Sequence, residues 1–174
     1  MMTTSRAIHF GTAEMIKNET KSTILKSIRQ IIDTYHRCGF KIKHVLGDQQ
    51  FECIRKNMEA QGINLNITGR DEHVPEIERF ILRVKERTRA IVNTLPLDIL
   101  PNRLVIEVVY NAMFWLNCFP HMNGIHAKMS PRTIVTRSHI DYNKHCKLQF
   151  GAYAQVHKQH NNSMLPRMTV AIAL

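Results

Sequence analysis

The stretch "KIKHVLGDQQFECIRKNMEAQGINLNIT" (residues 41–68) decides the fold class. Its first part, residues 41–48, is short and alternates apolar and polar side chains, which is typical of a β-strand. Residues 51–62 have a helical pattern that Gly62 closes, and residues 63–68 alternate again like a second strand. The stretch therefore predicts a strand–helix–strand unit of an α/β sheet, in which ligands bind at the carboxyl ends of the strands.

The segments before this unit continue the alternation of strands and helices. Residues 5–16 contain short β-leaning pieces around Ile8 and Phe10, which predict a strand or hairpin. Residues 22–40 predict a helix with Ser22 as its cap. The apolar face of this helix comprises Ile24, Leu25, Ile28, Ile31, Ile32 and Tyr35, which recur at helical spacing.

The second half of the chain is mainly helical. We expect a long helix, a mostly apolar core helix, a short helix and a β segment, at residues 74–96, 102–119, 130–136 and 148–157. We divide the chain into a partial core at residues 1–120 and a C-terminal extension, with the short helix and the β segment, at residues 121–174.

The chain carries a strong positive charge. It has 24 Lys and Arg against 14 Asp and Glu, a net charge of +10 and a pI near 9.8. Such an imbalance favours an anionic partner, most often nucleic acid and less often an acidic membrane surface. Hydrophobic residues make up 44% and charged residues 22%, which is typical of a globular protein and excludes a disordered one.

The cysteines and the apolar runs indicate the compartment. The four cysteines lie far apart without a CxxC pair, which favours reduced intracellular thiols over a zinc site. The longest apolar run, residues 104–119, contains Glu107 and is shorter than the ~20 residues that cross a bilayer. The N-terminus lacks an apolar signal core. We therefore expect no membrane association and a location in the cytoplasm or nucleus.

The expected helix at 74–96 has two different faces. Its apolar stripe comprises Ile77, Phe80, Ile81, Val84, Thr88, Ile91 and Val92. On the other face Arg79, Arg83 and Arg87 form a row, with Lys85 and Arg89 beside it. Guanidinium groups suit contact with phosphates, so this row is a candidate DNA-binding surface. A solvated helix face is the alternative interpretation.

Three acidic residues, in two places in the chain, are candidates for metal-dependent chemistry. Asp48 directly follows the first strand of the 41–68 unit, and Glu76 and Glu78 begin the helix at 74–96. Mg²⁺ binds hard carboxylate oxygens, and a two-metal site for phosphoryl transfer needs at least two, usually three, carboxylates from different elements. An α/β fold can bring Asp48 and one of the glutamates together. The alternative is that these carboxylates are solvated or cap helices.

Several motifs in order carry a family resemblance. "LGDQQFE" (46–52) resembles an Asp-Asn-Gly-x-Glu-Phe motif, and "VPEIERFILRVKER" (74–87) resembles Pro-x-x-Asn-Gly-x-x-Glu-Arg-x-Asn-Arg. "SPRTIVT", "KLQFGAYAQVH" and "MLPRMTVAIAL" are similar to later stretches of the same polyproteins. The chain thus resembles the integrase core of a copia-type retrotransposon, in the ribonuclease-H-like superfamily. "RDEHVPEIERFI" and "IDYNKHCKLQFG" look closest to open reading frames of diatom-type retroelements.

The resemblance implies a fold, a reaction and a set of ligands. The implied fold is α/β, a ribonuclease-H-like mixed sheet flanked by helices. Asp48 matches the second metal-binding Asp, and Glu78, rather than Glu76, matches the third ligand. The implied activity is DNA integration, in which two Mg²⁺ or Mn²⁺ ions activate a water or a 3′ hydroxyl for attack on a phosphodiester. The implied partners are DNA and a second copy, through core helices.

The chain also departs from the family's pattern. The first metal-binding Asp belongs on a strand upstream of "TTSRAIHFGTAE", and the nearby Glu14 does not suit its role. Gln49 and Gln50 replace the family's Asn-Gly, and 29 residues separate Asp48 from Glu78. We therefore expect a sheet that lacks its first strand, a short C-terminal β extension and no catalysis by this core alone. The alternative is a non-catalytic nucleic-acid-binding or scaffold remnant.

Overall fold

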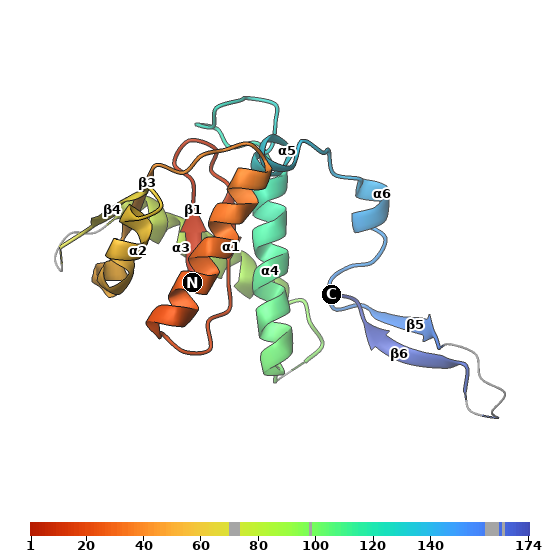
Figure 1. The fold of residues 1–174 in the computed structure, drawn as a ribbon. Coiled ribbons are helices and arrows are strands. Elements are labelled where there is room, and N and C mark those ends of the chain that lie inside the picture. The colour runs from red at the N-terminus through yellow and green to blue at the C-terminus, as the bar shows by residue number, and fades with distance from the viewer. Residues whose placement is uncertain (70–73, 98, 159–163, 165) are drawn as a thin grey trace.

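The computed structural model describes residues 1–69, 74–97, 99–158, 164 and 166–174 (Figure 1). In chain order the elements are β1 (Met2–Thr4), β2 (Gly11–Ala13), α1 (Lys21–Arg37), β3 (His44–Gly47), the 3-10 helix η1 (Gln49–Ile54), α2 (Arg55–Glu59), β4 (Asn64–Ile67), α3 (Pro75–Val92), α4 (Asn102–Cys118), α5 (Pro131–Thr136), α6 (Tyr142–His145), β5 (Tyr153–His157) and β6 (Met168–Ile172).

The strand–helix–strand unit expected at 41–68 is confirmed. β3 and β4 pair in parallel, with His44 opposite Asn64 and Gly47 opposite Ile67. The connection between them differs from the expected single helix, since η1 has 3-10 geometry and α2 is one short α-helix after it. Apolar side chains of the connection, above all Ile54 and Met58, are fully buried in a cluster with α1 and β4. Burial of this face fixes the parallel pair against the rest of the body.

The mixed α/β character is confirmed, but the described residues do not form the expected mixed sheet. Their strands form three separate two-stranded sheets, in the pairs β1–β2, β3–β4 and β5–β6. The physical reason is that β1 to β4 span only three or four residues each, and no ladder of hydrogen bonds joins β1 to β3. Helices, and not a continuous ladder, therefore hold the strand pairs in place.

The hairpin expected at residues 5–16 is present but shifted. β1 and β2 pair with Met2 opposite Ala13, so Ile8 and Phe10 lie in the connection and not in a strand. His9 between them has a φ of +58°, which places the backbone in the left-handed region. The turn directs Ile8 into a cluster with Ile31, Tyr35 and Val135. Tertiary burial against α1 thus overrides the local β preference of this segment.

α1 buries the apolar face that its sequence predicts. The buried apolar side chains are Ile24, Ile28, Ile31, Ile32 and Tyr35. The cap is Thr20, not Ser22, because the Thr20 side chain accepts the hydrogen bond of the Thr23 amide. Gly39, with a φ of +82°, follows the helix end in the left-handed conformation that favours glycine.

Two layers of helices enclose the N-terminal hairpin. Met1 packs against the clusters of α1, whereas Met2 packs against Phe80, Val84 and Met113 of α3 and α4. Successive residues of a strand point to opposite faces, so this alternation places α1 on one face and α3 with α4 on the other. Figure 1 shows the same arrangement, with α1 in front of β1 and α3 behind it.

α4 holds the hairpin through one polar side chain. The Asn117 side chain accepts a hydrogen bond from the Gly11 amide and donates one to the Gly11 carbonyl, both at 2.8 Å. An ideal Cβ at Gly11 would lie 2.1 Å from Cζ of Phe80, so only glycine lets this ring approach the strand. Asn117 is buried, and the pair of hydrogen bonds satisfies all polar groups that meet there.

The C-terminal part contains one well-buried element and one exposed hairpin. Ser130 caps α5 as predicted, by accepting the Thr133 amide at 3.1 Å, and Val135 is fully buried against α1. β5 and β6 form an antiparallel hairpin that projects from the body (Figure 1). The division at residue 120 stays a prediction. In the part of the chain that the structure describes, no helix has the length and apolar character to span a membrane.

Candidate functional site

Asp48 lies where the sequence predicts, directly after the last residue of β3. Its side chain is exposed and does not cap η1, while its backbone carbonyl accepts the Phe51 amide at 2.9 Å. The carboxylate therefore stands at the carboxyl end of a parallel strand, the place where α/β sheets bind ligands. Its role as a metal ligand stays a prediction.

Glu76 and Glu78 lie in the first turn of α3, as the sequence predicts. The positive end of the helix dipole stabilises carboxylates at this place. Glu76 pairs with Arg6 of the β1–β2 connection at 2.6 Å, and this contact joins the hairpin to α3. Glu78 is exposed, and its amide donates to the Val74 carbonyl at 3.2 Å. The choice of Glu78 over Glu76 as the candidate ligand rests on the Glu-Arg pair of the motif resemblance and stays a prediction.

The candidate metal-binding carboxylates, Asp48 and Glu78, do not fit a two-metal centre. Within residues 1–69, 74–97, 99–158, 164 and 166–174, no three His, Cys, Asp or Glu side chains gather closely enough to hold a metal ion. Glu14 uses its backbone, rather than its carboxylate, to bind the N-terminal residue, since its carbonyl accepts the Met1 ammonium at 2.7 Å. Two dications held together need more carboxylate charge than Asp48 and Glu78 supply.

The basic row of α3 lies on the exposed side of the helix. Arg79, Arg83 and Arg87, with Lys85 and Arg89 beside them, are all exposed. Within the described residues none of the five pairs with an acid, although Arg6, Arg55 and Arg103 each do. Consecutive arginines of the row are four residues apart, or about 6 Å along the helix axis. The row thus presents evenly spaced positive charge that forms no ion pair with any acid of the described residues.

Two histidines far apart in the sequence, His9 and His121, stack on each other, and no local sequence pattern predicts this contact. The rings of His9 and His121 lie 3.9 Å apart at an angle of 18°. Nε2 of His9 donates to the Asn123 carbonyl at 3.2 Å, and the Asn123 amide donates to Nδ1 of His121, also at 3.2 Å. Because Nδ1 of His121 accepts this hydrogen bond, it carries no proton. Burial, then the nearby His9 and Arg83, lower the pKa of His121 and so favour the neutral ring.

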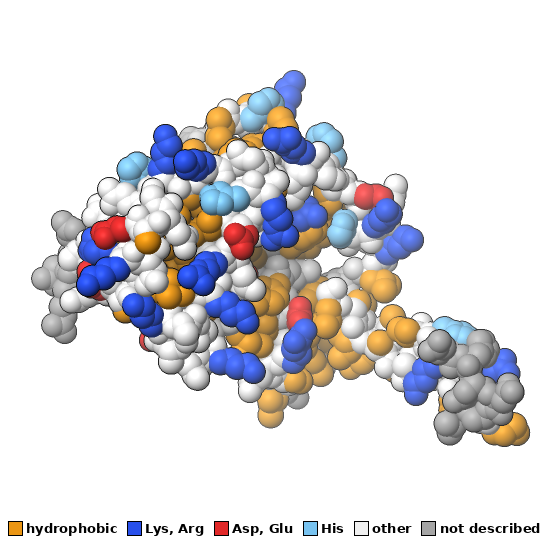
Figure 2. All heavy atoms as spheres, in the orientation of Figure 1, with side chains coloured by type: hydrophobic (Ala, Val, Ile, Leu, Met, Phe, Trp, Pro, Cys, Tyr) orange, Lys and Arg blue, Asp and Glu red, His pale blue; other side chains and the backbone are white. Residues whose placement is uncertain are grey.

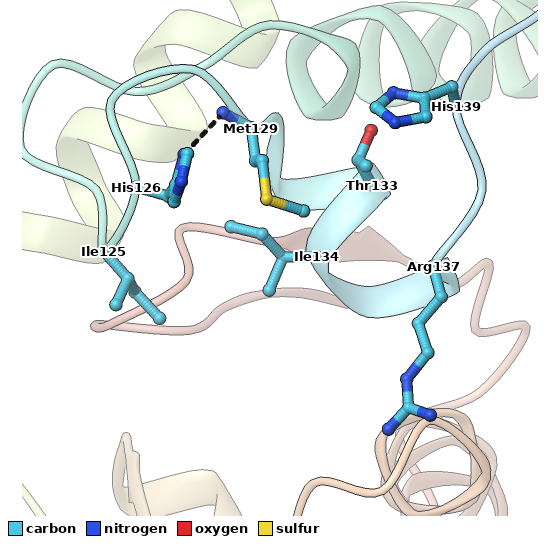
Figure 3. Close-up of a pocket in the computed structure, with 7 residues that line it drawn as sticks. All are labelled: Ile125, His126, Met129, Thr133, Ile134, Arg137 and His139. Atoms are coloured by element: carbon cyan, nitrogen blue, oxygen red, sulfur yellow. Dashed lines mark hydrogen bonds between the residues drawn. The ribbon is translucent and has the colours of Figure 1, made fainter.

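A hollow beside α5 offers little chemistry. It has a volume of about 420 Å³ and is lined mainly by Ile125, Met129, Ile134 and their neighbours (Figure 3). Nδ1 of His126 accepts the amide of Met129 at 3.1 Å and so serves the backbone of its own loop. Arg137 points away from the other lining residues, towards α1 (Figure 3). No set of polar groups converges on this space, so it is not the candidate site.

Comparisons with known proteins identify the fold. No family model and no curated protein matches the chain. The structure of the HTLV-2 integrase catalytic core domain, in complex with magnesium and in a trimeric form, is similar to this chain with a TM-score of 0.57 and 17% sequence identity. The match covers 76% of this chain and 81% of that chain. The fold of this chain is therefore similar to that of an integrase catalytic core.

Proposed function

We propose that this chain is an integrase-like core that binds DNA through the basic row of α3. The observation that carries the proposal is the row itself, five exposed cations without an acidic partner among the described residues, on a helix of an integrase-like fold. Phosphate contacts from such side chains supply most of the sequence-independent affinity of DNA-binding proteins. The copia-type and diatom-type assignments rest on the sequence motifs alone.

We further propose that the chain alone does not carry out strand transfer. The related HTLV-2 core is described in complex with magnesium, and hard oxygens of Asp48 and Glu78 suit Mg²⁺ or Mn²⁺. Two carboxylates do not fit two such ions, so no reaction step through a metal pair follows for this chain. A Mn²⁺ titration with Asp48→Ala and Glu78→Gln as controls tests for a single weak site. Equal binding by all three proteins excludes these residues as ligands.

The test of DNA binding is the salt dependence of affinity for a labelled duplex. Substitution of Arg79, Arg83 and Arg87 by Ala removes three phosphate contacts and lowers the slope of log K against log salt by up to about 3. A matched variant that also loses three exposed cations, Arg103→Ala with Lys144→Ala and Lys158→Ala, controls for net charge. The proposal is wrong if the two triple variants lose the same affinity and slope.

A non-catalytic scaffold is the second candidate function. Its supporting observation is that α4 exposes Val105 at 43% and Tyr110 at 37%. The HTLV-2 core was described in a trimeric form, and we propose self-association of this chain through its core helices. Light scattering of the purified chain checks this, with Val105→Glu as the variant expected to lower the mass. A monomer at all concentrations excludes it.

A further inference from the structure

The outer face of α1 is a second basic surface. α1 carries Lys21, Lys26, Arg29, His36 and Arg37, all exposed, against the single acid Asp33. The helix buries its isoleucines on the other side, so basic side chains make up most of what it presents to solvent along this face. Figure 2 shows basic side chains spread across the view in front of α1, with few acidic side chains between them.

These cations also lack acidic partners. Within the described residues, Lys21, Lys26, Arg29 and Arg37 form no ion pair with a carboxylate, and Nε of Arg37 donates only to the Asp33 backbone carbonyl, at 3.3 Å. Lys41 and Lys43, both exposed, follow the helix and extend the positive surface towards β3. A face with this many uncompensated cations complements a polyanion.

The α1 face and the α3 row lie on opposite sides of the body. Met1 packs under α1 and Met2 packs under α3, so the hairpin β1–β2 separates the two helices. From Lys26 to Arg37 the charges extend about 16 Å along the helix, which corresponds to roughly five phosphates of one strand. One straight duplex segment cannot contact both faces of the body at once.

We propose that the outer face of α1 is a second DNA-binding surface, so that one molecule contacts two duplex segments, one on α1 and one on α3. A membrane surface is the poorer partner, because a helix that binds lipid inserts large apolar side chains. Along the whole of α1, every residue of which is described, no large apolar side chain is exposed. This inference rests on the proposed function for the α3 row and adds to it a second surface on α1.

The experiment measures whether the full chain joins two duplexes. A biotinylated duplex on beads is incubated with the protein and a fluorescent duplex of different sequence, and the retained fluorescence is measured. Three triple variants are compared at equal concentration: Lys26→Ala with Arg29→Ala and Arg37→Ala, the α3 triple, and the charge-matched control. Circular dichroism and light scattering verify that each keeps the fold and the mass of the parent, since an oligomer joins duplexes through one surface.

The α1 triple is expected to retain at least tenfold less fluorescence than the control while it still binds a single duplex through α3. Its salt slope falls by up to about 3 relative to the parent. The inference is overturned if the α1 triple retains as much fluorescence as the control. It is also overturned if the α1 triple joins duplexes like the control and, in a separate assay, loses only binding to vesicles that contain phosphatidylserine. If the α3 triple binds a single duplex like the parent and only the α1 triple loses this binding, the proposed role of α3 is wrong. DNA binding by the α1 surface is then still supported.

Discussion

The two antiparallel hairpins of this chain differ in what holds them. β1–β2 has strands of three residues, yet it is enclosed by α1 on one face and by α3 and α4 on the other. β5–β6 has strands of five residues and exposes Tyr153, Val156 and Val170. A hairpin alone is marginally stable in water. Burial, not the length of the ladder, therefore makes the first hairpin a rigid support for the N-terminal end of α3.

The largest expected effect tests the polar anchor of the first hairpin. Asn117→Ala leaves the amide and the carbonyl of Gly11 buried without partners, and each costs about 1–3 kcal/mol. The free energy of unfolding, measured in urea, falls by about 2 to 6 kcal/mol. Gln155→Ala on the exposed second hairpin is the matched control and changes it by less than about 0.5 kcal/mol. Equal losses in the two variants contradict the comparison.

The next effect tests the close packing of the first hairpin. Gly11→Ala places a methyl group where Phe80 Cζ lies 2.1 Å away and Met113 Sδ 2.8 Å away, so the core of α3 and α4 must shift. Overpacking of this kind lowers the free energy of unfolding by about 1–3 kcal/mol. At Gly69 a Cβ meets nothing within 4 Å, so Gly69→Ala serves as the control. A thermal midpoint unchanged at both positions shows that the hairpin is looser than described.

A smaller effect depends on pH and comes from His121, which stacks on His9 in the turn of the first hairpin. Burial, His9 and Arg83 hold the folded pKa of His121 below its usual value, so the unfolded chain binds this proton more readily. The stability contributed by the neutral ring is complete above about pH 6.5 and is lost as the pH falls towards the folded pKa. His121→Phe keeps the stack on His9 without the titration. Urea unfolding from pH 5 to 8 is expected to show a weaker pH dependence for this variant, and identical curves exclude His121 as the cause.

The smallest effect concerns the second hairpin. Val170 is 66% exposed, so Val170→Ser removes little buried surface and changes the free energy of unfolding by less than about 0.5 kcal/mol. Hydrogen exchange monitors the same difference without mutation. Amides of β5 and β6 are expected to exchange faster than those of α4. If the amides of β5 and β6 exchange slowly in a monomer, the hairpin is protected from solvent, which contradicts its exposed side chains.

Much of the fold follows from local sequence patterns. The strand–helix–strand unit at 41–68, the apolar face of α1 and the Ser130 cap are confirmed, because each depends on side chains close together in the chain. The positions of Ile8 and Phe10 were wrong, because contacts with α1 and the positive φ of His9 decide them. The number of strands that pair in one sheet could not be predicted either, since strand pairing depends on contacts between distant segments.

The candidate site divides in the same way. The place of Asp48 after β3 and the exposed row from Arg79 to Arg87 could be predicted, because strand ends and helical periodicity are local properties. The pairing of Glu76 with Arg6 and the stack of His9 on His121 could not. Each of these contacts joins residues that are far apart in the sequence. No periodic pattern marks such a partner before the chain has folded.

The bond between Gly11 and Asn117 also determines how this protein meets other chains. A strand whose amide and carbonyl groups remain open is a template for pairing with a foreign strand, which is a route to aggregation. At Gly11 both groups are already occupied by a side chain of the same molecule. The side-chain amide of Asn117 thus takes the place of a neighbouring strand at Gly11 and prevents a strand of another molecule from pairing there.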